Sequence, residues 1–241
     1  MAKKYKVAVP LAAAAVLALF FLLIWSIGNT GTDTEKETKK NVSEQNGKSP
    51  YRVCIETGHG IDASGKWDTG CTWQGDEEAK LMIPITQAMT DYLRDQGVYV
   101  YTDAYSGNDR NLDVTLDYLD THDVDAFVNV HCDYEGSDAG TMPLYCTEEQ
   151  KELARYLNEG VHEAVEISDR GLQKRTDLET LCNAKVHCVS CLFETGSISS
   201  DHEVLTKESR AYGEGLAKGL FNYLRERGND EQKQHTEDSG E

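Results

Sequence analysis

Short apolar runs and longer amphipathic stretches alternate along the middle of this sequence. Four of the apolar runs are rich in valine, isoleucine, phenylalanine and tyrosine, and each is short enough to be a buried strand. They occupy residues 51–56, 98–103, 125–130 and 189–193. The pattern therefore predicts four strands that are separated along the chain by other elements.

The stretches between these runs have the spacing of helices. Apolar residues recur every four positions over residues 81–96, and Gly97 follows as a typical helix end. Similar spacing predicts helices over residues 148–164 and 204–225. No internal repeat is visible. Strands that alternate with helices favour a single α/β domain with a mostly parallel sheet flanked by helices.

The N-terminal part of the chain has a different pattern. Residues 7–27 contain no charged residue, and at ~1.5 Å per residue this run is just long enough to cross a hydrocarbon layer of ~30 Å. Lysines at positions 3, 4 and 6 precede it, so the positive-inside rule keeps the N-terminus in the cytoplasm. We expect residues 1–28 to be a cytoplasmic stub and a single transmembrane helix. A cleaved signal peptide is the alternative, although its apolar region is usually shorter.

Two polar segments flank the predicted domain. Residues 29–50 have balanced charges and little apolar content, which indicates a flexible linker. Residues 226–241 contain no aliphatic or aromatic side chain and are expected to form a disordered acidic tail. The domain itself is then residues 51–225, and the anchor places it on the outer side of the cell membrane.

Charge limits the choice of partner. The chain has 241 residues, which suits one substantial domain with short appendages. Residues 51–225 contain 15 basic and 32 acidic residues, a net charge of −17. Binding to phosphate backbones needs basic patches, so nucleic acid is excluded as a partner.

The sequence contains seven cysteines, at positions 54, 71, 132, 146, 182, 188 and 191. Outside the membrane they can form disulfides, and the odd number leaves at least one unpaired. The single C-x-x-C pair, Cys188 and Cys191, lacks the second pair of a structural zinc site. Three residues apart on one strand, these side chains would point to opposite faces. Packing or disulfide roles are therefore favoured over metal binding.

Candidate chemistry follows three of the apolar runs. The first run leads through Gly58 to His59 and Gly60, the third leads directly into His131, and the fourth leads directly into Glu194. In an α/β sheet the carboxyl ends of parallel strands meet at one crevice, where ligands bind. Two histidines and a carboxylate are thus predicted to share a site. A charged Glu194 beside so apolar a run needs a partner or a function.

A catalytic zinc usually takes three protein ligands and leaves a fourth position for water. Glu77 or Glu78, at the start of the first long helix, could complete the set with the two histidines. Either glutamate could instead favour the helix N-terminus through the helix dipole. Pro84 leaves open whether Glu78 lies on the helix or just before it.

These motifs resemble the zinc-dependent N-acetylmuramoyl-L-alanine amidases of bacterial cell walls. ETGHG is similar to the family's D-x-G-H-G, EAKLMIPIT to its E-x-x-x-x-hydrophobic helix start, and DAFVNVHCD to its segment around S-I-H-x-N. CLFETGSISS is similar to the segment that carries its last glutamate, and DRGLQ to a recurrent D-R-G. The resemblance implies zinc ligands at His59, Glu78 and His131, and a catalytic carboxylate at Glu194.

The resemblance spans about residues 52–224 and includes some departures. Glu56 replaces the usual aspartate, Asn129 and Asp133 replace a serine and an asparagine, and Ser197 replaces a phenylalanine. None of these changes removes a ligand. An arginine common in the middle of the family domain has no clear counterpart here.

The implied reaction is hydrolysis of the amide between N-acetylmuramic acid and the L-alanine of the peptidoglycan stem peptide. In it, Zn²⁺ would activate water and Glu194 would act as general base. One alternative is a catalytically degenerate peptidoglycan-binding or regulatory module of the same fold. A zinc peptidase that cuts within the stem peptide is another.

Overall fold

The computed structural model describes residues 51–105 and 111–238. They fall within one compact unit, Lys48–Glu241. The predicted membrane anchor at residues 1–28 and the linker at residues 29–50 lie outside the described residues. Within the described ranges, no helix is both long enough and apolar enough to cross a membrane.

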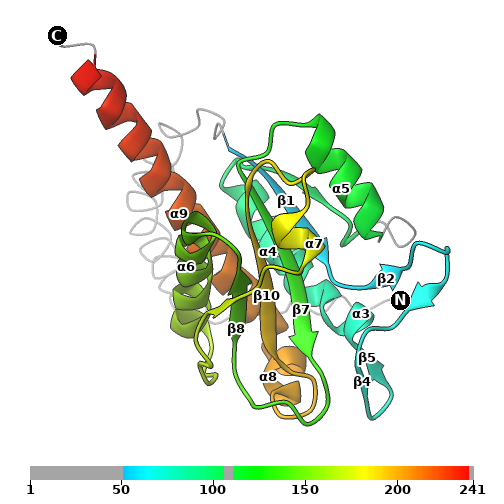
Figure 1. The fold of residues 1–241 in the computed structure, drawn as a ribbon. Coiled ribbons are helices and arrows are strands. Elements are labelled where there is room, and N and C mark those ends of the chain that lie inside the picture. Colours follow the sequence, from blue (N-terminus) through cyan, green and yellow to red (C-terminus); the bar gives the residue numbers. More distant parts are fainter. Residues whose placement is uncertain (1–50, 106–110, 239–241) are drawn as a thin grey trace, which may run out of the picture. The chain divides into compact units, whose positions relative to one another are not determined.

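The centre of the fold is a six-stranded sheet (Figure 1). In spatial order its strands are β6 (Tyr99–Thr102), β1 (Arg52–Thr57), β7 (Ala126–Asp133), β10 (Val189–Ser197), β8 (Met142–Tyr145) and β9 (Gln173–Lys174). The first four strands are parallel to one another, and β8 runs antiparallel to β10. The prediction of a mostly parallel sheet is confirmed, and all four predicted strands belong to it.

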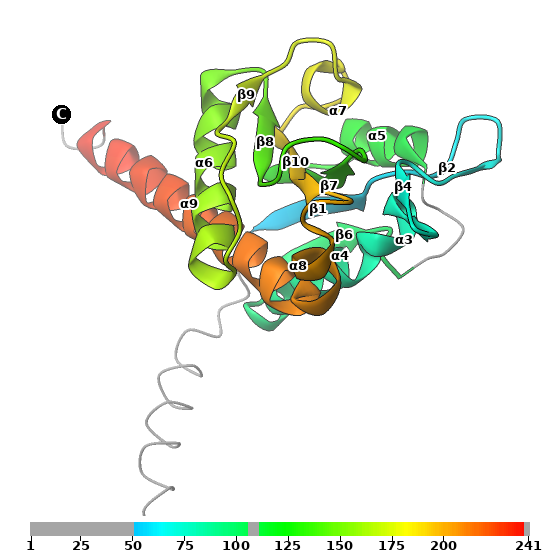
Figure 2. The same cartoon turned by 90° about the horizontal axis from the view of Figure 1, so that it is seen from below.

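Helices cover both faces of the sheet. They are α3 (Glu78–Leu81), α4 (Ile83–Asp95), α5 (Leu112–Thr121), α6 (Glu148–Ala164), α7 (Glu179–Cys182), α8 (His202–Lys207) and α9 (Ser209–Asp238). Figure 2 shows α5 and α7 on one side of the sheet and α4, α8 and α9 on the other. Two small hairpins, β2 (Gly60–Ile61) with β3 (Trp67–Asp68) and β4 (Thr72–Trp73) with β5 (Asp76–Glu77), lie between β1 and α3 in the sequence.

Side chains alternate along the strands between two apolar cores. Val128 and Val130 of β7 pack in the large core with α4, α6 and α9, whereas Phe127 packs in a smaller core beneath α5. The two cysteines of the C-x-x-C pair follow the same alternation, because Cys191 lies in the large core and Cys188 packs against the smaller one. The prediction that they point to opposite faces is confirmed. His131 lies on the same face of β7 as Phe127, which is the face covered by α5 and α7.

Local sequence signals explain where the helices begin and end. Thr147 and Gln150 form a capping box that starts α6, so the predicted helix over residues 148–164 is confirmed. The helix predicted over residues 81–96 is split at Met82 into α3 and α4. Pro84 accounts for the break, because it has no N–H to continue the hydrogen bonding of α3 and is tolerated in the first turn of α4.

The C-terminal prediction needs correction. The helix predicted over residues 204–225 is divided at Glu208, and α9 continues to Asp238. A disordered tail from residue 226 is therefore wrong for residues 226–238. This segment has no proline and is rich in glutamate, glutamine, lysine and arginine, which are good helix formers. Its first turn is tied to α6, since Glu226 accepts a hydrogen bond from Tyr156 and Arg227 pairs with Glu149.

Candidate metal centre and active site

The carboxyl ends of three neighbouring strands bring the candidate residues together. His59 follows β1 by two residues, and His131 lies directly opposite Glu194 in the pairing of β7 with β10. The two strands continue to Asp133 and Ser197, so these side chains lie within the strands rather than after them. His131 and Glu194 still lie near the carboxyl ends of their strands, at the same edge of the sheet, as the sequence predicts.

Glu78 lies between the two histidines. Its Oε2 atom is 3.2 Å from His59 Nε2, and its Oε1 atom is 2.9 Å from His131 Nδ1. One ligand atom from each of the three residues lies within 4.8 Å of the other two, a spacing that a single metal ion could bridge. Glu78 is the first residue of α3, and only 2% of its surface is exposed. Glu78 therefore lies on the helix and not before it.

Two backbone N–H groups hold the Glu78 carboxylate. Cys71 N–H donates to Oε2 at 3.0 Å, and Cys132 N–H donates to Oε1 at 3.1 Å. Burial by itself would raise the pKa of Glu78, but the hydrogen bonds with His131 and His59 outweigh burial and hold that pKa well below its usual value. Glu78 is therefore a fixed anion, positioned before any ligand arrives.

A second carboxylate orients His59. Asp68 Oδ2 lies 2.8 Å from His59 Nδ1, which leaves Nε2 facing Glu78. Burial lowers the pKa of His59, but the interactions with Glu78 and Asp68 raise it overall to about 9. Metal-binding histidines commonly donate their second ring nitrogen to a carboxylate in this way. Asp68 was not anticipated from the sequence, where the available signal was a carboxylate in the segment between the first two candidate ligands.

Two glycines make room for the site. A Cβ atom at Gly58 would lie 2.4 Å from Cε1 of His131, and one at Gly70 would lie 2.4 Å from Cδ2 of His59. No real Cβ atom makes contacts that short. The glycines beside His59 favour close approach in the sequence, and at Gly58 the group that approaches is the His131 ring. Gly70 was not anticipated.

The neighbouring Glu77 points elsewhere. Its Oε2 atom accepts a hydrogen bond from Trp67 Nε1 at 2.9 Å and lies 2.8 Å from Lys80 Nζ. It lies outside the group of close ligand atoms that contains Glu78. Between the two glutamates that the sequence left open, the structure brings only Glu78 to the histidines.

Glu194 has the environment of a functional carboxylate. Its Oε2 atom is shielded from solvent and has no hydrogen-bond partner among the described residues. Burial raises the pKa of Glu194 to about 7; the His131 ring lowers it, and the Glu78 and Asp133 carboxylates raise it. A carboxyl group with a pKa near neutrality can both accept and release a proton at physiological pH.

Arg170, from the D-R-G segment, binds the end of β7, and its charge partly offsets the rise that burial causes in the pKa of Glu194. Its Nη1 atom lies 2.8 Å from Asp133 Oδ2, and its Nε donates to the Gly140 carbonyl at 2.9 Å. Asp133 is the residue that follows His131 and Cys132 at the end of β7. The D-R-G segment thus holds the end of the strand that carries a candidate ligand.

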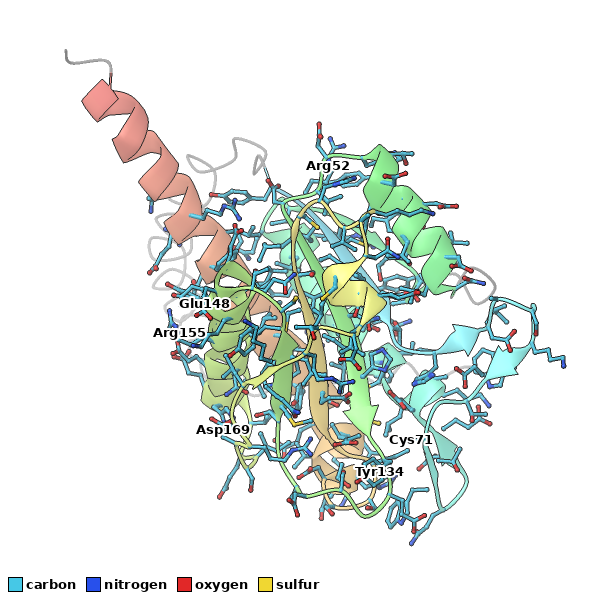
Figure 3. The ribbon with its side chains drawn as sticks, in the orientation of Figure 1. Arg52, Cys71, Tyr134, Glu148, Arg155 and Asp169 are labelled. Carbon is cyan, nitrogen blue, oxygen red and sulfur yellow. The ribbon has the colours of Figure 1, made fainter. Side chains whose placement is uncertain are left out.

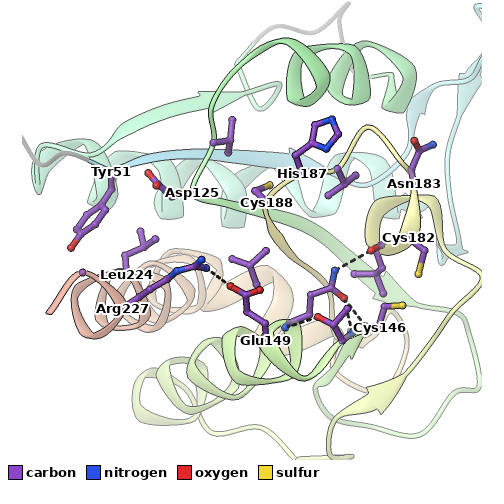
Figure 4. Close-up of a pocket in the computed structure, with 17 residues that line it drawn as sticks. Tyr51, Asp125, Cys146, Glu149, Cys182, Asn183, His187, Cys188, Leu224 and Arg227 are labelled. Atoms are coloured by element: carbon purple, nitrogen blue, oxygen red, sulfur yellow. Dashed lines mark hydrogen bonds and ion pairs between the residues drawn. The ribbon is translucent and has the colours of Figure 1, made fainter. Parts of the chain in front are cut away.

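Two of the candidate ligands, His59 and His131, line an acidic cavity of about 500 Å³. Its carboxylates are Glu56, Asp62, Asp68, Asp113, Asp177 and Glu179. No lysine or arginine lines it within the described parts of the chain. Figure 4 shows a different cavity, of about 540 Å³, in which Arg227 and Glu149 face each other. Tyr51, Asp125 and Cys188 line it at the amino ends of the strands, so it contains none of the candidate site residues.

Comparison with known proteins places this arrangement in a family. Residues 53–226 match the family of N-acetylmuramoyl-L-alanine amidases. The chain belongs to this family. The match covers all of the sheet except Arg52 and includes every candidate site residue, so the resemblance drawn from the sequence motifs is confirmed.

Solved amidase structures share the fold. The amidase AmiC2 of Nostoc punctiforme is 23% identical, with a TM-score of 0.64 over 74% of this chain and 99% of that one. The CwlD amidase of Clostridioides difficile, solved in complex with the GerS lipoprotein, is 19% identical, with a TM-score of 0.62 over 73% and 98%. Ami1 of Mycobacterium smegmatis is 18% identical, with a TM-score of 0.62 over 74% and 99%. No curated protein sequence matches the chain.

Proposed function

We propose that this protein is a zinc-dependent amidase that hydrolyses the bond between N-acetylmuramic acid and the L-alanine of the peptidoglycan stem peptide. The observation that carries the proposal is the convergence of His59, Glu78 and His131 on one point, with Glu194 on the neighbouring strand. Membership of the amidase family supports the choice of bond.

The residues present fit a zinc ion. Two imidazole nitrogens and one carboxylate form a donor set that catalytic zinc commonly uses. His59 would offer Nε2, because Asp68 occupies its Nδ1 atom, and His131 would offer Nδ1. Glu78 keeps its charge in a buried position because its interactions with His131 and His59 outweigh burial, and two backbone N–H groups also hold its oxygens. When bound there, zinc would polarise the scissile carbonyl and lower the pKa of water toward neutrality.

Glu194 supplies the proton transfer. Its free Oε2 atom can accept a proton from the attacking water and later deliver it to the leaving amine of L-alanine. A pKa of about 7 suits both steps, since the group is then neither a very weak base nor a very weak acid at neutral pH. Hydrolysis by this route needs no covalent intermediate with the protein.

The protein's location is part of the proposal. The uncharged run at residues 7–27 and the lysines before it support a single-pass membrane anchor, with the amidase domain on the cell-wall side. Peptidoglycan lies on that side of the membrane. An anchor would keep the domain close to its substrate without a separate wall-binding module.

The residues that depart from the family pattern all have local partners, which argues against a degenerate module. Asn129 donates to Glu56 at 2.8 Å, Asp133 pairs with Arg170, and Ser197 Oγ donates to the Tyr134 carbonyl at 3.4 Å. Asn129 and Glu56 both depart from the family pattern, and they bond to each other. None of these changes enters the group of candidate ligands.

Digestion of purified peptidoglycan by the zinc-loaded protein tests the proposal. Mass spectrometry of the soluble products should show stem peptides that begin with L-alanine. Products cut further along the stem would instead identify a peptidase. No product from a folded, zinc-loaded protein would favour a binding or regulatory module.

A further inference from the structure

Two cysteines lie side by side next to the candidate metal centre. The Sγ atoms of Cys71 and Cys132 are 3.8 Å apart. Cys71 belongs to the loop between β3 and β4, and Cys132 belongs to β7, 61 residues further along the chain. Figure 3 shows Cys71 beside the carboxyl end of β7. Both sulfurs lie on the side of the large apolar core, away from the open cavity.

The same two residues hold Glu78 through their backbones. Their N–H groups donate to the two oxygens of that carboxylate, one to each. The Cys71 thiol also approaches the backbone carbonyl oxygens of Cys132 at 3.6 Å and Asp133 at 3.5 Å. The loop and the strand therefore already meet at this point, and the two Sγ atoms, which are 3.8 Å apart, must approach to about 2.05 Å to form a bond.

We propose that Cys71 and Cys132 form a disulfide that fastens the loop carrying Asp68 and Gly70 to β7, beneath the Glu78 carboxylate. The proposal rests on the positions of the two thiols and not on the amidase activity. It names a specific pair among the seven cysteines, all of which are free thiols in the structure.

A small disulfide such as oxidised glutathione is a sufficient oxidant. The Cys71 thiolate, which is the more exposed of the two, attacks one sulfur of that reagent and releases one glutathione thiolate. The Cys132 thiolate then attacks the Cys71 sulfur of the mixed disulfide and releases the second glutathione. The two cysteines lose two electrons, the reagent gains two, and the two thiol protons go to the released glutathione.

The other cysteines supply contrasts. Cys188 and Cys191 belong to different cores on the two faces of the sheet and cannot pair without unfolding it. Cys146 and Cys182 are neighbours at the other end of the molecule, as their shared cavity and mutual hydrogen bond indicate. A change at Cys146 is therefore a matched control that alters a cysteine pair without touching the loop or β7.

Peptide mapping tests the proposal directly. The full-length chain is equilibrated with an excess of oxidised over reduced glutathione, with and without zinc, then alkylated and digested. We expect mass spectrometry to find the peptides of Cys71 and Cys132 joined, in both conditions and in Cys146→Ser. Cys71→Ser should lose the joined pair. This variant should still fold, because the Cys71 side chain is only partly buried.

Thermal unfolding gives a second readout. A disulfide typically raises Tm by roughly 5–15 °C in a domain of this size. We expect this rise on oxidation in the wild type and in Cys146→Ser, and not in Cys71→Ser.

Two results would overturn the proposal. One is that both thiols stay fully alkylatable after oxidation of the folded chain. The other is that zinc alone protects both thiols from alkylation while no joined peptide forms, which would make the pair a soft-metal site. Failure of the amidase assay would leave both results unaffected, so the two proposals are tested separately.

Discussion

Glu78 is the residue on which the candidate metal centre depends most, because both of its oxygens are engaged by imidazoles and by backbone N–H groups. Its neighbour Glu77 has the same chemistry and bonds instead to Trp67 and Lys80. The two adjacent glutamates therefore form a natural pair for comparison.

We expect Glu78→Ala to abolish stoichiometric zinc binding and Glu77→Ala to preserve it. Loss of an outer partner of a ligand usually lowers metal affinity by about 10- to 100-fold, so loss of the ligand itself should exceed that range. Elemental analysis and competition with a chelator would measure the effect. If zinc stays bound in Glu78→Ala but is lost from Glu77→Ala, the ligand is Glu77 and not Glu78.

Glu194 gives a pH-dependent prediction for the metal-free protein. The folded state holds the Glu194 proton up to about pH 7, whereas an ordinary glutamate releases it near pH 4.5. The stabilisation from the raised pKa is fully present below about pH 4.5 and is lost as the pH rises through about 7. The change in the free energy of unfolding should reach about 3 kcal/mol.

Urea unfolding of the metal-free wild type and of Glu194→Gln across this pH range would measure the change. The other titratable groups are common to the two proteins, so the difference between the curves isolates Glu194. If the free energies of unfolding of the two proteins change in parallel between pH 4.5 and 7, the pKa of Glu194 is not raised.

At the scale of secondary-structure elements, the turn from β1 into His59 depends on close approach. We expect Gly58→Ala to lower zinc affinity and to destabilise the fold, because its Cβ would overlap the His131 ring. Gly65→Ala, in the same loop region, is the control. Its Cβ would meet no atom within 4 Å, and only its positive φ of 80° adds strain. Zinc titration and thermal unfolding of both variants would check the difference, and equal zinc affinity would contradict it.

The elements that could be predicted from the sequence are those whose apolar pattern matches their period. β1, β7, β10 and α6 bury continuous runs or one stripe, and the pattern reports that burial. The hairpins β2 to β5 and the short helix α7 escaped prediction because two to four residues show no period. The ten-residue α5 was not predicted either, although Leu112, Leu116 and Leu119 have the spacing of a helix.

The same reasoning applies to the site. Its four central residues follow predicted strands or begin a predicted helix, so chain order and sheet topology suffice to place them at one edge. Asp68 and the N–H groups of Cys71 and Cys132 could not be found that way. Their positions depend on how the loop after His59 folds back, which no periodicity encodes.

For the full chain, the proposed anchor implies that the domain lies on the outer side of the membrane. We expect protease added to intact, wall-stripped cells to remove the domain, because residues 29–241 should face outward. Immunoblotting against the domain would follow the loss. Complete protection until the cells are lysed would contradict this topology.

The proposed hydrolysis requires the three candidate metal ligands and Glu194 to act together within the family fold. Glu194→Gln preserves the shape of the side chain and leaves all three candidate ligands in place, but it cannot accept a proton. General acid–base catalysis typically contributes about 10²- to 10⁴-fold to a rate. This variant therefore separates the chemistry from folding and from metal binding.

The most direct measurement is the rate at which zinc-loaded wild type and zinc-loaded Glu194→Gln release stem peptides with N-terminal L-alanine from purified peptidoglycan. We expect one zinc per chain and the same fold in both proteins, with a rate about 10²- to 10⁴-fold lower in the variant. Release of the same peptides by the folded, zinc-loaded variant at nearly the wild-type rate would contradict the account.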